Sequence, residues 1–128
     1  MEVKSSKKPK FTWLGKFHVA CRGVVWGIFG QTSFYVHLPV AVLTVLLAAF
    51  LQFDAWRWVV LLLTIGMVLS VELLNSSLER LFHGLPEAWQ EKCWPALDIA
   101  AGAVLVASIT AIIVGLILFI PPILAYFG

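Results

Sequence analysis

The sequence contains few charged residues. Asp, Glu, Lys and Arg make up only 12% of its 128 residues, whereas 61% are hydrophobic. A soluble domain of this size needs a much more polar surface, so the composition excludes that class and indicates a membrane protein. The few polar groups inside its apolar runs are then the first candidates for function.

Cysteine is scarce, and neither cysteine nor histidine is clustered. Neither Cys21 nor Cys93 has metal-ligand spacing to another cysteine or to a histidine, and both fall in segments that we place on the cytoplasmic side. A zinc site and a structural disulfide are therefore not expected. The three histidines show no ligand spacing either and are expected at the membrane interface: His18, His37 and His83.

Two common sequence signals are absent. The glycines between positions 23 and 30 match neither a Walker loop nor the GxGxxG pattern, which excludes both kinds of nucleotide-binding loop. The N-terminus is basic, but the mixed segment that follows, with Lys16, His18 and Arg22, is not the compact apolar core of a signal peptide. A cleavable signal peptide is therefore not predicted.

What the chain has is a succession of long apolar runs. Residues 1–10 are basic and expected to be disordered, and residues 11–128 are predicted to form a single membrane domain. Apolar residues recur at helical spacing over residues 11–30, which indicates an amphipathic surface helix. Three later runs approach the roughly 20 residues that cross a core of about 30 Å. The predicted spans cover about residues 34–53, 56–82 and 94–119.

Basic residues set the expected orientation of this all-α membrane protein. They gather before the first long apolar run, and no acidic residue follows Glu2 in that region. The basic residues there are Lys4, Lys7, Lys8, Lys10, Lys16 and Arg22. Because cytoplasmic segments carry an excess of Lys and Arg, the N-terminus should be cytoplasmic and the C-terminus, after three spans, outside.

The second predicted span carries a stripe of polar residues. Glu72, Asn75 and Glu79 fall within roughly 60° of one another on a helix, near its cytoplasmic end. A carboxylate at membrane depth is costly, which indicates a functional site. Glu72 is suited to act as general base toward a lipid hydroxyl, and Glu79 to hold Mg²⁺ with substrate phosphates. Asn75 and Asp98 would complete a minimal set for phosphoryl transfer.

These polar residues also have structural interpretations. Asn75, Ser76 and Ser77 suit hydrogen bonds between helices in the membrane. Glu79 is near enough to the interface to reach water or to pair with Arg80, and Asp98 suits the start of a helix. A proton- or cation-coupled transporter with Glu72 as carrier is a third hypothesis. It is disfavoured because the polar groups cluster toward one face of the membrane.

Small residues line the third predicted span. Three spans leave little interior in which to bury Glu72, and small side chains allow helices to approach closely in lipid. Both observations predict a homo-oligomer, in which neighbouring copies supply the missing walls. The small residues are Ala96, Ala100, Ala101, Gly102, Ala103, Ala107 and Ser108.

The segment Glu72–Glu79 resembles the E-x-x-N-[ST]-[AS]-x-E signature of the small bacterial integral-membrane diacylglycerol kinases. Within that family the chain looks most like the undecaprenol kinases. Further similarity lies in Phe17–Gly23, Ser33–His37 and Asp98–Val104. The order and spacing of these segments agree over about residues 11–125.

This resemblance implies a homotrimer of three-span subunits with an N-terminal surface helix, in the bacterial cytoplasmic (inner) membrane. Such a protein transfers the γ-phosphate of Mg-ATP to the hydroxyl of diacylglycerol or undecaprenol, at sites between subunits on the cytoplasmic side. Carried over by motif, the catalytic residues are Glu72 and Asn75, the metal ligands Glu79 and Gln31, the nucleotide-binding residues Asp98, Glu79 and Arg22, and the lipid-binding residues Glu72 and Ser76.

The sequence departs from the family pattern at three positions. Gln31 stands where the family usually has a second metal-binding Glu, Thr32 where a basic residue often follows, and Leu97 where a Lys precedes Asp98. The loss of one carboxylate and one Lys should weaken Mg-ATP binding. The alternative hypothesis is therefore a catalytically impaired member that binds lipid or nucleotide, or serves as a membrane scaffold.

Overall fold

A computed structural model describes residues 12–128 of the chain. The part of the chain that it describes is helical, with short breaks. In order, the helices are α1 (Trp13–Phe29), α2 (Phe34–Phe50), α3 (Ala55–His83) and α4 (Glu87–Phe127). The prediction of an all-helical protein is confirmed, and the predicted disordered segment 1–10 lies outside the described residues.

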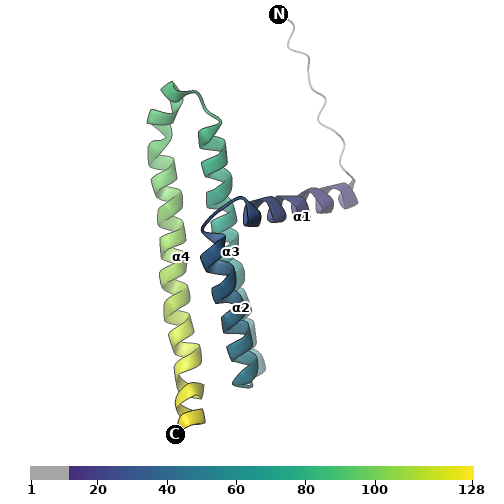
Figure 1. The fold of residues 1–128 in the computed structure, drawn as a ribbon, viewed down its shortest axis with the longest axis vertical. Helices are drawn as coiled ribbons and strands as arrows, with labels where there is room; N and C mark the ends of the chain where they lie inside the picture. Colours follow the sequence, from purple (N-terminus) through teal and green to yellow (C-terminus); the bar gives the residue numbers. More distant parts are fainter. Residues whose placement is uncertain (1–11) are drawn as a thin grey trace, which may run out of the picture.

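The first helix leaves the rest of the molecule at a steep angle. Thr12 caps α1, because its side-chain oxygen accepts a hydrogen bond from the backbone N–H of Gly15 at 3.1 Å. After a break of four residues, α2 continues at 104° to α1. Figure 1 shows α1 projecting sideways while the other three helices run roughly along one axis. No residue of α1 is buried.

The main packing joins α3 to α4, which run side by side over much of their length (Figure 1). The hydrophobic core lies toward the end where α2 turns into α3. It consists of Ala48, Phe53, Leu61, Leu118 and Phe119. The Phe53 and Phe119 rings are 4.8 Å apart between centroids, which ties the turn to α4.

The turn between α2 and α3 covers residues 51–54. Gln52 adopts a positive φ of 52°, and among residues 12–128 no other non-glycine residue has a positive φ. Arg57 follows one turn into α3 and donates to Asp54 at 3.0 Å. Asp54 and Arg57 thus form an ion pair at the beginning of α3.

Two helices, α3 and α4, are long and apolar enough to cross a membrane. The number of candidate spans rises to three if the bent pair of helices α1 and α2 is counted as a single span. By itself α2 has 17 residues, because it ends at Phe50 rather than at the predicted residue 53. The second span agrees closely with its prediction, Ala55–His83 against 56–82.

The last helix is much longer than its predicted range of 94–119. It begins at Glu87 and ends at Phe127, so Pro95, Pro121 and Pro122 all lie inside it. A proline removes one helical hydrogen bond, but it does not break a helix whose neighbouring turns are held by packing. The Trp94 ring lies 4.9 Å from the ring of Phe82 on α3 and holds the early turns. Tyr126 lies 5.3 Å from Phe50 and holds the last turn.

Candidate active site

The buried polar side chains of residues 12–128 lie together on α3. Glu72 is 2% exposed, Ser76 2% and Asn75 9%. Their spacing of three and four residues places them on one side of the helix, as the sequence predicts. Burying a carboxylate costs free energy unless it is paired or used, so Glu72 is the most demanding group of this cluster.

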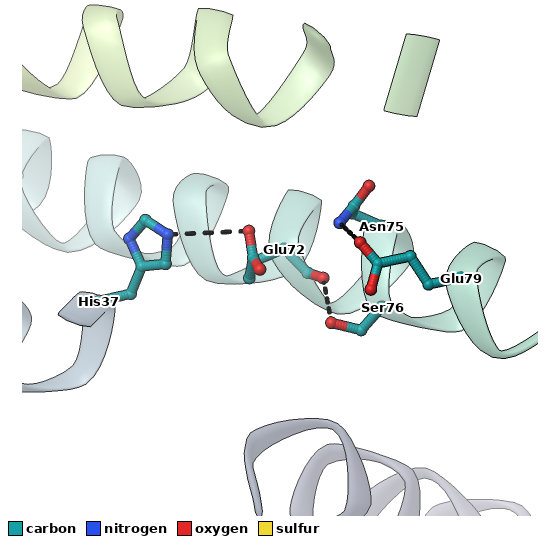
Figure 2. Close-up of polar contacts among 5 residues, drawn as sticks. All are labelled: His37, Glu72, Asn75, Ser76 and Glu79. Carbon is teal, nitrogen blue, oxygen red and sulfur yellow. Dashed lines mark hydrogen bonds and ion pairs between the residues drawn. The ribbon is translucent and has the colours of Figure 1, made fainter. Parts of the chain in front are cut away.

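Asn75 links this cluster to Glu79, one turn closer to the end of α3. The Asn75 side-chain amide donates to Glu79 Oε1 at 2.9 Å (Figure 2). The other side-chain atom, Asn75 Oδ1, is buried and has no hydrogen-bond partner in the part of the chain that the structure describes. A buried acceptor without a partner is costly, and a hydroxyl donor or a cation would satisfy it.

Ser76 uses its hydroxyl within the helix. Its Oγ donates to the backbone carbonyl oxygen of Glu72 at 2.8 Å (Figure 2). The donor hydrogen of Ser76 is therefore committed to the backbone, a common arrangement for serine inside helices. A lipid hydroxyl could still donate to Ser76 Oγ, so its assignment to lipid binding stays a prediction.

His37 belongs to the site, although the sequence places it at the interface as an unremarkable residue. It lies in the first turns of α2, and its Nε2 is 3.7 Å from Glu72 Oε2 (Figure 2). The His37 side chain is 22% exposed. Its partner is 35 positions away on another helix, which no search for ligand spacing along the chain can find. The one available signal was its place in the Ser33–His37 segment.

A cavity of about 530 Å³ opens between α2, α3 and α4. Its walls are almost entirely apolar, with residues such as Val40, Leu61 and Leu118. His37 lines this cavity, but Glu72 is not among the lining residues of the described chain. The cavity is large enough for part of a hydrocarbon chain and presents the imidazole to it.

Three predicted site residues lie outside α3. Arg22 is exposed on α1 and stacks on Trp26, with 5.1 Å from the guanidinium carbon to the ring centroid. Gln31 lies in the break between α1 and α2, and Asp98 is exposed on α4. Within residues 12–128, no hydrogen bond or ion pair joins any of them to Glu79. Within residues 12–128, hydrogen bonds therefore join only the α3 residues of the predicted site.

Magnesium is the ion that the predicted chemistry requires. Among the described residues, no group of three His, Cys, Asp or Glu side chains could hold a metal ion. Mg²⁺ does not need such a group, because it commonly uses one or two carboxylates together with substrate phosphates. The Glu79 carboxylate fits this ion, and the Asn75 amide, which donates to Glu79 Oε1, orients that carboxylate; Asn75 Oδ1 points away from Glu79 (Figure 2).

Arg80 does not pair with Glu79. Its Nη2 donates instead to the backbone carbonyl oxygen of Trp26 at 3.1 Å, near the end of α1. The guanidinium also fills the space beside Gly30, where an added Cβ would meet Arg80 Nη2 and the Trp26 carbonyl oxygen. Arg80 thus ties α1 to the helix that carries the polar cluster.

Comparisons with known proteins point to one family. The family model "Prokaryotic diacylglycerol kinase" matches residues 18–119. The "Diacylglycerol kinase" of Synechocystis sp. is 36% identical over 129 aligned residues, which cover 94% of this chain and 74% of that protein. The "Undecaprenol kinase" of Bacillus subtilis is 26% identical over 121 residues, covering 94% of this chain and 98% of that protein.

A shorter match is found to the "Diacylglycerol kinase" of Escherichia coli (strain K12), 36% identical over 76 residues, 59% of this chain and 62% of that protein. The family model covers most of the chain, including α3 with its polar cluster and His37. The chain belongs to the prokaryotic diacylglycerol kinase family and is an ATP-dependent lipid kinase.

Proposed function

We propose that the chain transfers the γ-phosphate of Mg-ATP to the hydroxyl of diacylglycerol or undecaprenol at the cytoplasmic face of the bacterial inner membrane. One observation carries this proposal. A buried carboxylate, Glu72, adjoins the imidazole that lines an apolar cavity, and the Asn75–Glu79 pair follows on the same helix. A lipid hydroxyl and a phosphate-bearing nucleotide need these two environments side by side.

The distance between the two carboxylates gives them separate roles. Seven residues of helix place Glu72 and Glu79 about 10 Å apart along the axis of α3. That separation is too large for both to bind one ion, so Glu72 provides the base for the lipid hydroxyl. Glu79, oriented by Asn75, and Gln31 would hold Mg²⁺. When bound, Mg²⁺ neutralises the charge of the phosphates during transfer.

The nucleotide-binding assignment of Arg22 and Asp98 fits best in a homotrimer. Both side chains are exposed in a single copy and lie on helices other than α3. In the proposed trimer the sites lie between subunits, so one copy supplies the α3 cluster and its neighbour supplies further contacts to ATP. In this arrangement the N-terminus is cytoplasmic and the C-terminus lies outside.

The test is ATP-dependent transfer of labelled phosphate in mixed micelles, with diacylglycerol and undecaprenol offered separately and in competition. We expect Glu72→Gln to lower kcat by about 10²–10⁴-fold, the range of a lost general base. Glu91→Gln is the matched control, because Glu91 is an exposed carboxylate on α4. Equal rates for Glu72→Gln and the wild type would refute the assigned base.

The impaired relative is the second candidate, and Gln31 and Leu97 are the observation in its favour. It predicts that the wild type binds lipid or nucleotide without phosphorylating any long-chain alcohol. It also predicts that the double variant Gln31→Glu with Leu97→Lys creates activity. A wild type that phosphorylates either lipid excludes this candidate.

A further inference from the structure

We propose that Arg80 binds the phosphate groups of ATP, which makes it a cationic residue of the nucleotide site. The inference rests on the proposed function and deepens it, because it adds a residue to the site that holds Mg-ATP. The place of the guanidinium, its unused donors and the charge of the site carry it.

The guanidinium of Arg80 lies next to both segments that carry the proposed metal ligands. Arg80 directly follows Glu79 on α3, and its side chain reaches the end of α1. There it fills the space beside Gly30, the residue before Gln31. Because the phosphates of ATP share the metal ion with Glu79 and Gln31, they come within reach of this guanidinium.

Most of the donors of Arg80 are available to a ligand. A guanidinium has five N–H donors, and Nη2 of Arg80 uses one of them for the Trp26 carbonyl oxygen at 3.1 Å. Among residues 12–128, Arg80 makes no other hydrogen bond and no ion pair. The bond to Trp26 holds the guanidinium in place, and its remaining N–H groups match the paired oxygens of a phosphate.

A pocket beside these donors gives a ligand room. Its volume is about 380 Å³, and Trp26, Phe29, Gly30 and Arg80 line it. That volume is in the range of small-molecule sites. Gly30 keeps space for the guanidinium, because an added Cβ would meet Arg80 Nη2 and the Trp26 carbonyl oxygen.

The charge of the proposed nucleotide site leaves a cation to be supplied. The set taken from the motif, Asp98, Glu79 and Arg22, contains two carboxylates and one cation. The phosphates of ATP carry more negative charge than one Mg²⁺ balances, so a further cation beside them is stabilising. Arg57, the other arginine of α3, lies at the opposite end of that helix. Arg80 is therefore the arginine that α3 offers beside Glu79.

Arg80→Met removes the charge and keeps much of the length of the side chain. We expect it to raise the Kd for Mg-ADP by about tenfold or more, the scale of a lost hydrogen bond to a charged group. Arg80→Lys keeps the charge and should raise the Kd less. Isothermal titration in mild detergent measures both. Lys92→Met is the matched control, because Lys92 is an exposed cation on α4 that lies over Trp89, and it should bind Mg-ADP as the wild type does.

Inorganic tripolyphosphate separates phosphate binding from the attachment of α1. This probe carries the phosphates without the base and should compete with Mg-ADP. We expect Arg80→Met to weaken tripolyphosphate and ATP by the same factor. A loss for ATP with unchanged tripolyphosphate binding would mean that Arg80 acts only by holding α1, and this would overturn the proposal.

Gly30→Ala tests the same contact without removing the charge, and it covers the case in which Arg80→Met does not fold. The added Cβ would displace the Arg80 guanidinium, so we expect weaker binding of Mg-ADP. Adding Arg80→Met should then cause little further loss, because both changes act on one contact. Gly23→Ala is the control, since a Cβ there meets nothing within 4 Å. Fully additive losses in the double variant would contradict the proposal.

Nucleotide binding and phosphate transfer are measured separately, so the two possible failures are distinguishable. An Arg80→Met protein with the wild-type Kd for Mg-ADP would overturn the role of Arg80 and leave the proposed kinase reaction standing. A wild type that binds Mg-ADP through Arg80 but phosphorylates neither lipid would refute the proposed reaction and support the phosphate contact.

Discussion

The side-chain amide of Asn75 has a hydrogen-bond partner for its nitrogen but none for its oxygen in the described chain. This difference leads to a prediction for a single residue. Its amide donates to Glu79, whereas Oδ1 is buried without a partner in the described chain. Asn75→Leu removes the unpartnered oxygen, so we expect little loss of thermal stability. We expect a kcat at least tenfold lower and a raised Mg²⁺ requirement, measured by titrating activity with Mg²⁺.

Ser77→Ala is the control for Asn75. Ser77 is exposed on the same turn, and its hydroxyl donates to the Leu74 carbonyl oxygen at 2.8 Å. It should leave the Mg²⁺ requirement unchanged. If Asn75→Leu kept the wild-type Mg²⁺ dependence, the hydrogen bond from Asn75 to Glu79 would not be needed to orient a metal ligand.

For single residues, the sequence predicts which side chains share one face of a helix, but it does not predict contacts between side chains of different helices. The grouping of Glu72, Asn75 and Glu79 followed from helical periodicity, and the structure places them together on α3. The pairing of His37 with Glu72, and of Arg80 with Trp26, depends on how α1 and α2 pack against α3. No local rule contains that information, because the partners are 35 and 54 positions apart.

Among the elements, α1 has no buried residue, and Arg80 donates the side-chain hydrogen bond that joins it to α3 in the described chain. We expect Arg80→Ala to free the end of α1 from α3, because the Trp26 carbonyl oxygen loses its donor and the space beside Gly30 empties. Spin labels on α1 and α3 should then report a broader distance distribution.

Arg22→Ala is the matched control for Arg80, since Arg22 stacks on Trp26 of its own helix. It should leave the distance distribution narrow. An equally narrow distribution in Arg80→Ala would mean that Gly27, which lets Leu73 approach α1 closely, is sufficient to hold this helix.

Helix ends were the least predictable property of the elements. The apolar runs correctly indicated α3, but the prolines at 95, 121 and 122 were interpreted as boundaries of α4. A proline in the sequence shows only that one backbone N–H is missing. Whether the helix continues past it depends on the residues that pack against that helix. Here Phe82 and Phe50 pack against the outer turns of α4, and the sequence alone does not disclose those contacts.

The whole molecule is expected to be a homotrimer, and the small-residue face of α4 provides the test. A Cβ added at Gly102 would meet nothing within 4 Å in a single copy. Gly102→Leu should therefore be tolerated by the subunit but should separate the copies if this face packs against a neighbour. Native mass spectrometry in mild detergent should show trimers for the wild type and smaller species for the variant.

Gly23→Leu is the control for Gly102, because Gly23 also has open space around it but lies on α1. It should leave the assembly intact. A wild type that is monomeric under the same conditions would contradict the trimer, and with it the idea that a neighbouring copy completes the site with Arg22 and Asp98.

The unequal lengths of the helices have a further consequence. With 17 residues, α2 spans only about 26 Å, less than a hydrocarbon core of about 30 Å, whereas the 41 residues of α4 reach about 60 Å. The helix that is shorter than the hydrocarbon core is therefore α2, and His37 lies near the beginning of that helix. A thicker bilayer would draw that end below the headgroups and away from nucleotide. The same subunit would then be a slower kinase in a thick membrane than in a thin one.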